Sequence, residues 1–303
     1  MRWFDNVNYD FVSNRKVAYV ISGIMITASL IAIIFKGPQF GIDFTGGKEF
    51  VLEFEQPIEV AEVRDALEGP LDGTPTVKLF GSPTDVLIRT DAEGEVSEVQ
   101  EDITSALQQL YSDNPVTVVK TSIVGARFAE DLKSGALNAI IFGIIVIFIY
   151  ILIRFKNWTY SLGAVAALAH DIIVVLGIFT IFAGIAPFSM EVDQTLIAAL
   201  LTILGYSIND TVIVYDRVRE RLLTHKGKDF EKVMNRGIND TLSRTAITAL
   251  TTFFSVLVLF IFGGETLKGF SFALMLGIIF GTYSSIFVAT AITIDLEQKT
   301  QNA

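Results

Sequence analysis

Two pairs of polar residues lie inside long apolar runs of this sequence. In that position, they could transfer a proton or bind and release a cation. His170 and Asp171 are adjacent in one run, and Asn209 and Asp210 are adjacent in another, within the stretch GYSINDTVIVYDRVRER. A carboxylate in hydrocarbon costs at least about 2.5 kcal/mol and faces a pathway or a partner. Arg244, at the start of a later run, is a candidate cationic partner for Asp210. The alternative for each side chain is a hydrogen-bonded packing residue without a role in transfer.

Other chemistries fit the sequence poorly. The chain contains no cysteine, which excludes a disulfide framework, thiol catalysis and cysteine-based metal sites. The loop GIDFTGGK resembles a phosphate-binding loop, but Gly47 stands where that motif needs lysine, and a strand is expected to follow it. An intramembrane aspartyl protease needs both carboxylates at one depth, whereas we expect Asp171 near the bilayer centre and Asp210 near the cytoplasmic edge. We therefore expect no enzyme, no metal site and no cofactor.

The elements that must position these side chains are membrane helices. Of the 303 residues, 51% are hydrophobic and only 18% are charged. Six apolar runs are each long enough to cross a hydrocarbon core of about 30 Å at about 1.5 Å per helical residue. The first run is too long for the apolar part of a signal peptide and is followed by a poor cleavage site. The sequence therefore predicts a polytopic membrane protein that retains its first helix.

The basic residues predict the orientation of these helices, because arginine and lysine are held on the cytoplasmic side. They gather before the first run, between the second and third, and between the fourth and fifth. Both termini are then cytoplasmic. The predicted parts are a cytoplasmic N-terminal segment (1–16), the first span (17–36), an extracytoplasmic domain (37–130), the second, third and fourth spans (134–153, 158–183 and 194–215), a cytoplasmic loop (216–241), the fifth and sixth spans (242–262 and 269–294) and a cytoplasmic tail (295–303).

The extracytoplasmic segment has the pattern of a small folded domain. Between Gly37 and Glu130 it carries 18 acidic and 6 basic residues, which argues against a nucleic-acid partner and against docking on anionic lipid. Its periodicities follow the order strand, helix, strand, strand, helix, strand, which is the ferredoxin-like plan. The predicted fold is thus six transmembrane helices with a ferredoxin-like α+β domain between the first two. We expect this domain to dock or grip a partner.

Small residues recur every four positions in the sixth span. Gly277, Gly281 and Ser285 belong to this row, which lets helix backbones approach closely in lipid. We expect these residues to form a packing interface within the chain or with a different subunit.

Three motifs resemble the signatures of the SecF family of protein-export membrane subunits, which belongs with SecD in the SecDF complex and in the resistance-nodulation-division superfamily. They are GIDFTGG after the first span, ALAHDIIVVLGIF in the third and GYSINDTVIVYDRVRER across the fourth. The resemblance covers nearly the whole chain. Six helices with an outer domain between the first two is also the plan of one transmembrane half in that superfamily. The chain resembles the separate-subunit form and not a SecD–SecF fusion.

The resemblance implies a role in protein translocation in the bacterial cytoplasmic (inner) membrane. It implies SecD as an obligate partner, the SecYEG channel and, optionally, YajC as neighbours, and unfolded preprotein as cargo. Proton movement would drive the work. The family's buried aspartate in the fourth helix matches Asp210, and its arginine at the start of the fifth matches Arg244. We therefore expect Asp210 to carry the proton and Arg244 to be its switching partner, with Asp171 and His170 as relay or packing residues.

Rival functions remain at this point. One is an ion-driven half-transporter for lipids or small molecules, and another is a passive scaffold that holds SecD. Sodium is an alternative to the proton, because Asp210 beside Asn209, Ser207 and several threonines could also ligate that ion.

Overall fold

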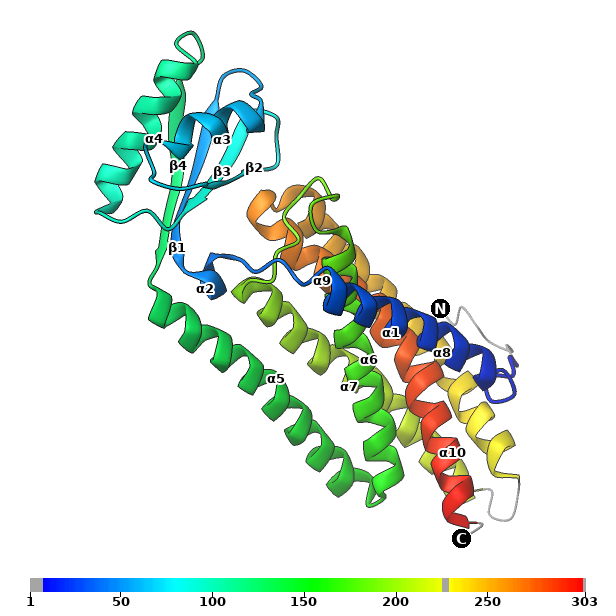
Figure 1. Cartoon of the computed structure of the whole chain (residues 1–303). Coiled ribbons are helices and arrows are strands. Elements are labelled where there is room, and N and C mark those ends of the chain that lie inside the picture. Colours follow the sequence, from blue (N-terminus) through cyan, green and yellow to red (C-terminus); the bar gives the residue numbers. More distant parts are fainter. Residues whose placement is uncertain (1–7, 225–228, 302–303) are drawn as a thin grey trace. The chain divides into compact units, whose positions relative to one another are not determined.

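The structure, a computed structural model, describes residues 8–224 and 229–301, which divide into two compact units (Figure 1). The helical unit comprises Met1–Pro38, Asn138–Ala183 and Thr195–Ala303, and the sheet unit comprises Gln39–Leu137 and Gly184–Gln194. Parts of three predicted cytoplasmic segments lie outside the described residues, namely 1–7, 225–228 and 302–303.

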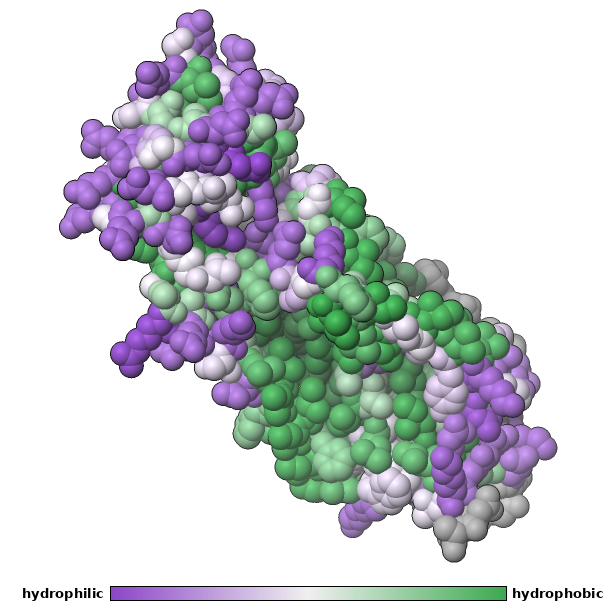
Figure 2. Space-filling model, viewed as in Figure 1, coloured by the Kyte–Doolittle hydropathy of each residue, from purple (hydrophilic) through white to green (hydrophobic). Residues whose placement is uncertain are grey.

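Among the described residues, six helical spans are long and apolar enough to cross a membrane, which confirms a multi-pass membrane protein. On the face shown in Figure 2, most of the surface over these helices is hydrophobic. The spans are α1 (Arg15–Phe35), α5 (Ala126–Phe155), α6 (Trp158–Phe182), α7 (Gln194–Thr224), α8 (Phe230–Phe262) and a last span built from α9 (Glu265–Ser284), a π-helical segment η1 (Ser285–Ala289) and α10 (Thr290–Gln301).

Several helices are longer than the apolar runs that indicate them. Helix α5 starts before its run, α7 continues beyond its run, and α8 starts well before its own. Hydropathy marks only the part of a helix that lipid surrounds, whereas polar turns at its ends are stabilised by caps. At the start of α8, for example, the side chain of Asp229 accepts a hydrogen bond from the backbone N–H of Glu231 at 3.1 Å. The predicted loop 216–241 is therefore mostly helical in its described residues.

The sheet unit has the predicted ferredoxin-like fold. Its four antiparallel strands lie in the order β2-β3-β1-β4, and two helices cover one face (Figure 1). Alternate residues of the central strand, such as Phe50 and Leu52, are buried against helix residues such as Val63 and Ile103. The elements are β1 (Gly47–Phe54), α3 (Val60–Glu68), β2 (Thr76–Leu79), β3 (Asp85–Thr90), α4 (Val96–Leu110) and β4 (Val116–Val124).

Two adjacent glycines make the turn into β1, after a short helix α2 (Ile42–Thr45). Gly46 has φ +75° and Gly47 has φ +108°, which L side chains rarely adopt. A Cβ atom at Gly47 would also lie 2.9 Å from the carbonyl oxygen of Thr90. These two glycines therefore make a tight turn between α2 and β1. A strand and not a helix comes next, which agrees with the rejection of a phosphate-binding loop.

Candidate functional site in the membrane helices

Asp171 is the centre of a polar cluster that joins three helices. It lies on α6 with 0% of its surface exposed, next to His170, which is 1% exposed. Its Oδ1 lies 3.0 Å from His170 Nδ1. Its Oδ2 accepts hydrogen bonds of 2.8 Å from the hydroxyls of Ser207 on α7 and Ser284 at the end of α9. Both carboxylate oxygens therefore have partners, which is the arrangement that a buried packing residue needs in lipid.

Glycines let α9 approach α7 closely enough to form this cluster. A Cβ atom at Gly281 would lie 3.1 Å from Cβ of Ser207, and one at Gly277 would overlap the side chain of Ile203. Gly277 and Gly281 thus lie against α7 within the same chain. Their lack of side chains allows the close packing of α9 on α7, and Ser284 at the end of α9 reaches Asp171.

The last span departs from α-helical geometry directly after Ser284. Ser285 opens η1, and its hydroxyl lies 2.8 Å from that of Thr211 and donates to the carbonyl of Ser207 at 3.2 Å. At the other end of η1, the hydroxyl of Tyr215 donates to the carbonyl of Ala289 at 3.1 Å. A π turn disturbs the regular backbone ladder, and hydroxyls of α7 bond to the disturbed region. The apolar run itself gives no sign of this segment.

Ser207, Thr211 and Tyr215 form one polar stripe along α7. They are four residues apart in the sequence, so they lie on the same face of the helix, and all three are buried. Thr211 and Tyr215 are not among the site residues that the sequence indicates. Their spacing from Ser207 was the available signal, but threonine and tyrosine in an apolar run are not conspicuous.

Asp210 is equally enclosed but has few hydrogen-bond partners. It is 1% exposed, and the hydroxyl of Thr282 approaches its Oδ2 only to 3.5 Å. Its Oδ1 has no hydrogen-bond partner among the described residues. Fewer hydrogen-bond donors therefore hold the oxygens of Asp210 than those of Asp171.

The structure does not bring Arg244 or Asn209 into contact with Asp210. Arg244 is exposed on α8, which packs chiefly on α9, and Asn209 is exposed on α7. The hydrogen bonds and ion pairs of the described residues include none between Asp210 and either side chain. The reason is geometric, since both side chains extend from the outer faces of their helices while Asp210 faces inward.

No group of three or more histidine, aspartate or glutamate side chains suited to a metal ion occurs in the part of the chain that the structure describes. The candidate site therefore consists of two buried aspartates. Asp171 accepts hydrogen bonds from serine hydroxyls, and Oδ1 of Asp210 has no hydrogen-bond partner among the described residues.

Two family profiles match the chain. The profile for "Protein export membrane protein SecD/SecF, C-terminal" matches residues 103–299, and the profile for the "SecD/SecF GG Motif" matches residues 31–58. The second includes the two glycines with positive φ at the start of β1.

Curated relatives and solved structures agree with these profiles. The protein translocase subunit SecF of Rhodothermus marinus is 52% identical over 299 residues, which cover 99% of this chain and 96% of the relative. The SecF subunit of Vibrio alginolyticus is 40% identical over 288 residues, covering 94% and 89%. The crystal structure of SecDF, a translocon-associated membrane protein from Thermus thermophilus, superposes with a TM-score of 0.85 at 30% identity. The match covers 98% of this chain but only 40% of that SecDF chain.

Proposed function

Because this chain belongs to the SecF family of protein translocase subunits, we propose that it works with a SecD subunit to promote export of unfolded preproteins at the expense of an ion gradient. The observation that carries the ion coupling is Asp210. It is a 1% exposed carboxylate in a membrane helix, and its Oδ1 lacks a hydrogen-bond partner among the described residues.

The proposed cycle assigns different roles to the two buried aspartates. Asp210 takes up the ion, and its change of charge alters its attraction to Arg244. Asp171, with His170, stays hydrogen-bonded and keeps α6, α7 and α9 together. One elementary charge crossing the membrane is worth about 2.3 kcal/mol per 100 mV, so repeated cycles can do mechanical work on cargo. The cycle binds and releases an ion and does not convert any substrate chemically, so the chain is proposed to act as a transporter subunit and not as an enzyme.

Exposed polar residues in the membrane helices support a partner subunit. Asn209 on α7 and Arg244 on α8 are exposed within this chain. Polar side chains of this kind are disfavoured against lipid and favoured against the polar groups of another helix bundle. We propose that SecD covers this face. The SecYEG channel and YajC are the proposed neighbours, in the bacterial cytoplasmic membrane.

The test replaces the carboxylate without changing its shape. Cells depleted of their own subunit receive Asp210→Asn, and preprotein export is measured with and without an ionophore that collapses the membrane potential. The matched control is Asp216→Asn, on the same helix, whose side chain is 40% exposed and pairs with Arg154. We expect Asp210→Asn to co-purify with SecD and lose export, while the control exports normally. Full, potential-sensitive export by Asp210→Asn would refute ion coupling through this residue.

The coupling ion is tested in the same cells. We propose the proton, because the weakly bonded Asp210 lacks the several close oxygen ligands that sodium would require among the described residues. Export that persists when potassium replaces all sodium in the medium would agree with the proton, and export that stops would identify sodium.

A further inference from the structure

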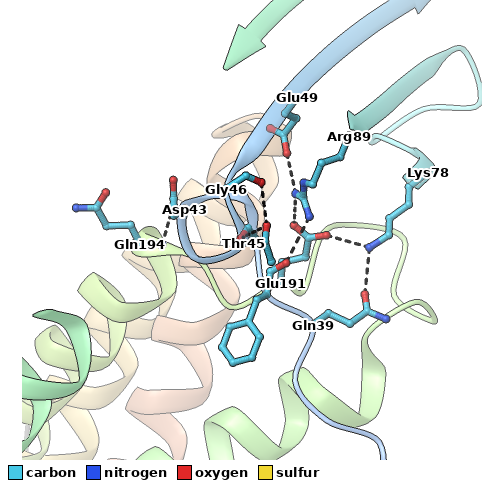
Figure 3. Close-up of polar contacts among 11 residues, drawn as sticks. Gln39, Asp43, Thr45, Gly46, Glu49, Lys78, Arg89, Glu191 and Gln194 are labelled. Atoms are coloured by element: carbon cyan, nitrogen blue, oxygen red, sulfur yellow. Dashed lines mark hydrogen bonds and ion pairs between the residues drawn. The ribbon is translucent and has the colours of Figure 1, made fainter. Parts of the chain in front are cut away.

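A buried ion-pair network in the sheet unit lies outside the site described above. Glu191, in the loop between α6 and α7, pairs with Arg89 of β3 and Lys78 of β2 at 2.9 Å each. Arg89 also pairs with Glu49 of β1 at 2.7 Å. Figure 3 shows these side chains converging on Glu191 from adjacent strands. The side chains of Glu191, Arg89 and Glu49 are only 12%, 13% and 9% exposed, so this network differs from ordinary surface ion pairs.

The charges in this network stabilise one another against burial. Burial alone would raise the pKa of Glu191, but hydrogen bonds and charges from Arg89 and Lys78 outweigh it and hold this pKa below its ordinary value. Burial opposes the charge on Arg89 too, yet Glu191 and Glu49 raise its pKa. Glu191 and Arg89 are therefore both charged at neutral pH. The contribution of Glu191 to stability is present above its unfolded pKa and is lost as the pH falls through its lowered folded pKa.

Backbone hydrogen bonds join the same loop to the linker that follows α1. Val192 donates to the carbonyl of Gln39 at 2.7 Å, and Gly41 donates to the carbonyl of Val192 at 2.9 Å. The approach is close, because a Cβ atom at Gly41 would lie 3.0 Å from Cβ of Asp193. We call these two segments, Gln39–Asp43 and Glu191–Gln194, together with their ion pairs to Lys78, Arg89 and Glu49, the linker clasp.

The linker clasp ends on the first residue of α7. The backbone N–H of Gln194, which opens α7, donates to Oδ2 of Asp43 at 2.9 Å (Figure 3). Glu191, three positions earlier in the chain, is held by β2 and β3. A few covalent bonds therefore separate the ion pairs of the sheet from the helix that carries Asp210.

We propose that the linker clasp is the coupling element that transmits movement of α7 to the sheet unit, with Glu191 and Arg89 as positioning residues. This inference rests on the proposed function, because it assigns a route for the work that Asp210 starts. One carboxylate on the loop pairs with cations from two adjacent strands, and these pairs resist separation of the loop from the sheet.

The first test separates ion movement from export. In Glu191→Gln, the shape of the side chain is kept while its charge is lost, and Glu53→Gln, an exposed carboxylate on β1, is the matched control. We expect Glu191→Gln to lose export by at least about fivefold, the usual lower size of coupling between sites. Ion uptake into vesicles by its complex with SecD should be retained. The control should change neither quantity. Export unchanged in Glu191→Gln would overturn the proposal.

The second test restores the clasp by a covalent bond. The chain has no cysteine, so a Gly41→Cys and Asp193→Cys pair can form one defined disulfide. The two Cβ atoms would lie 3.0 Å apart, closer than the roughly 3.5–4.5 Å of a disulfide, so the linker must shift slightly to accommodate the bond. Added to Glu191→Gln, the oxidised pair should restore export, and a reducing agent should abolish it again. The same pair in the otherwise unchanged chain measures how much export the two substitutions cost by themselves, and the restoration is compared with that value. Failure of the oxidised pair to restore export would mean that Glu191 serves only local folding.

The outcomes distinguish this inference from the proposed function. Normal export by Asp210→Asn would defeat the proposed function itself. Lost export in Asp210→Asn, with normal export in Glu191→Gln, would defeat the linker clasp alone. If Glu191→Gln accumulates poorly, Lys78→Gln takes its place, because Lys78 is 41% exposed and its removal leaves Glu191 paired with Arg89. Because the Glu191–Arg89 pair remains, it should show a partial loss of export with retained ion uptake, and normal export would again count against the clasp.

Discussion

Two aspartates in one helix bundle differ in what surrounds their oxygens, and this difference suggests their roles. Asp171 accepts from two serine hydroxyls and contacts His170, whereas Oδ1 of Asp210 is unpaired among the described residues. A carboxylate with fixed donors resists a change of charge, because each donor must find another acceptor. A carboxylate without them can change charge while its neighbours stay in place.

The hydroxyls that hold Asp171 should contribute measurably to stability. We expect Ser207→Ala and Ser284→Ala each to lower the free energy of unfolding by about 1 kcal/mol, because each removes one interhelical hydrogen bond in lipid. Ser161→Ala is the matched control, since its hydroxyl is buried on α6 without a partner among the described residues. Unfolding by denaturant in detergent micelles measures the difference. Equal costs at Ser161 and Ser207 would show that the bonds to Asp171 add nothing.

Part of this site is visible in the sequence and part is not. His170, Asp171 and Asp210 stand out because ionisable residues are rare in apolar runs. The partners of Asp171 do not, since Ser207 and Ser284 lie 36 and 113 positions away. Serine is common in membrane helices, so only the three-dimensional packing shows which serines reach a carboxylate.

Among the helices, the contact between α1 and α6 is unusually close. A Cβ atom at Gly177 of α6 would lie 2.6 Å from Cα of Ser29 on α1. Because that neighbour is backbone, a side-chain rotation cannot relieve the overlap. Gly177 therefore fixes how near the first helix comes to the third span.

Substitution of Gly177 should separate these two helices. We expect Gly177→Ala to destabilise the chain by about 1–3 kcal/mol, the usual cost of overpacking. Gly23→Ala on α1 is the control, because a Cβ atom there meets nothing within 4 Å. Unfolding in micelles compares the two variants. A stability loss at Gly177 no larger than at Gly23 would contradict the close contact.

Hydropathy predicts the existence of all six membrane spans but not their full course. It misses the polar turns of α7 and α8, which fold through caps and continuity with the span, and it misses η1. The order of strands and helices in the sheet unit is predictable, because the apolar residues of each element recur with the period of a strand or of a helix. The linker clasp is not, since Arg89 and Glu191 lie 102 positions apart and pair only after the sheet has formed.

For the whole molecule, the distribution of charge predicts which end of the helices faces the cytoplasm. The basic connections should stay inside, and the acidic sheet unit should be outside. Introduced cysteines can test this without background, because the chain contains none. Asp113 in the sheet unit and Lys299 near the end of α10 are both exposed.

We expect Asp113→Cys to react with a membrane-impermeant maleimide in intact cells, and Lys299→Cys to react only after the membrane is opened. Both variants lie outside the apolar part of any span, so neither should disturb folding. Labelling of Lys299→Cys in intact cells would reverse the proposed orientation.

Helix α7 is also a lever, because it is one unbroken helix of 31 residues, about 46 Å long. Asp210 lies about 24 Å along it from Gln194, whereas the flank of the helix is only about 5 Å from its axis. If a rearrangement around Asp210 moves the flank of α7 by about 0.4 Å, the helix tilts by about 5° about that point. Over the distance of about 24 Å to Gln194, this tilt displaces Gln194 by about 2 Å. Because α7 is stiff, a small rearrangement around Asp210 becomes a larger movement at Gln194. A movement of this size is enough to break the hydrogen bond between Gln194 and Asp43.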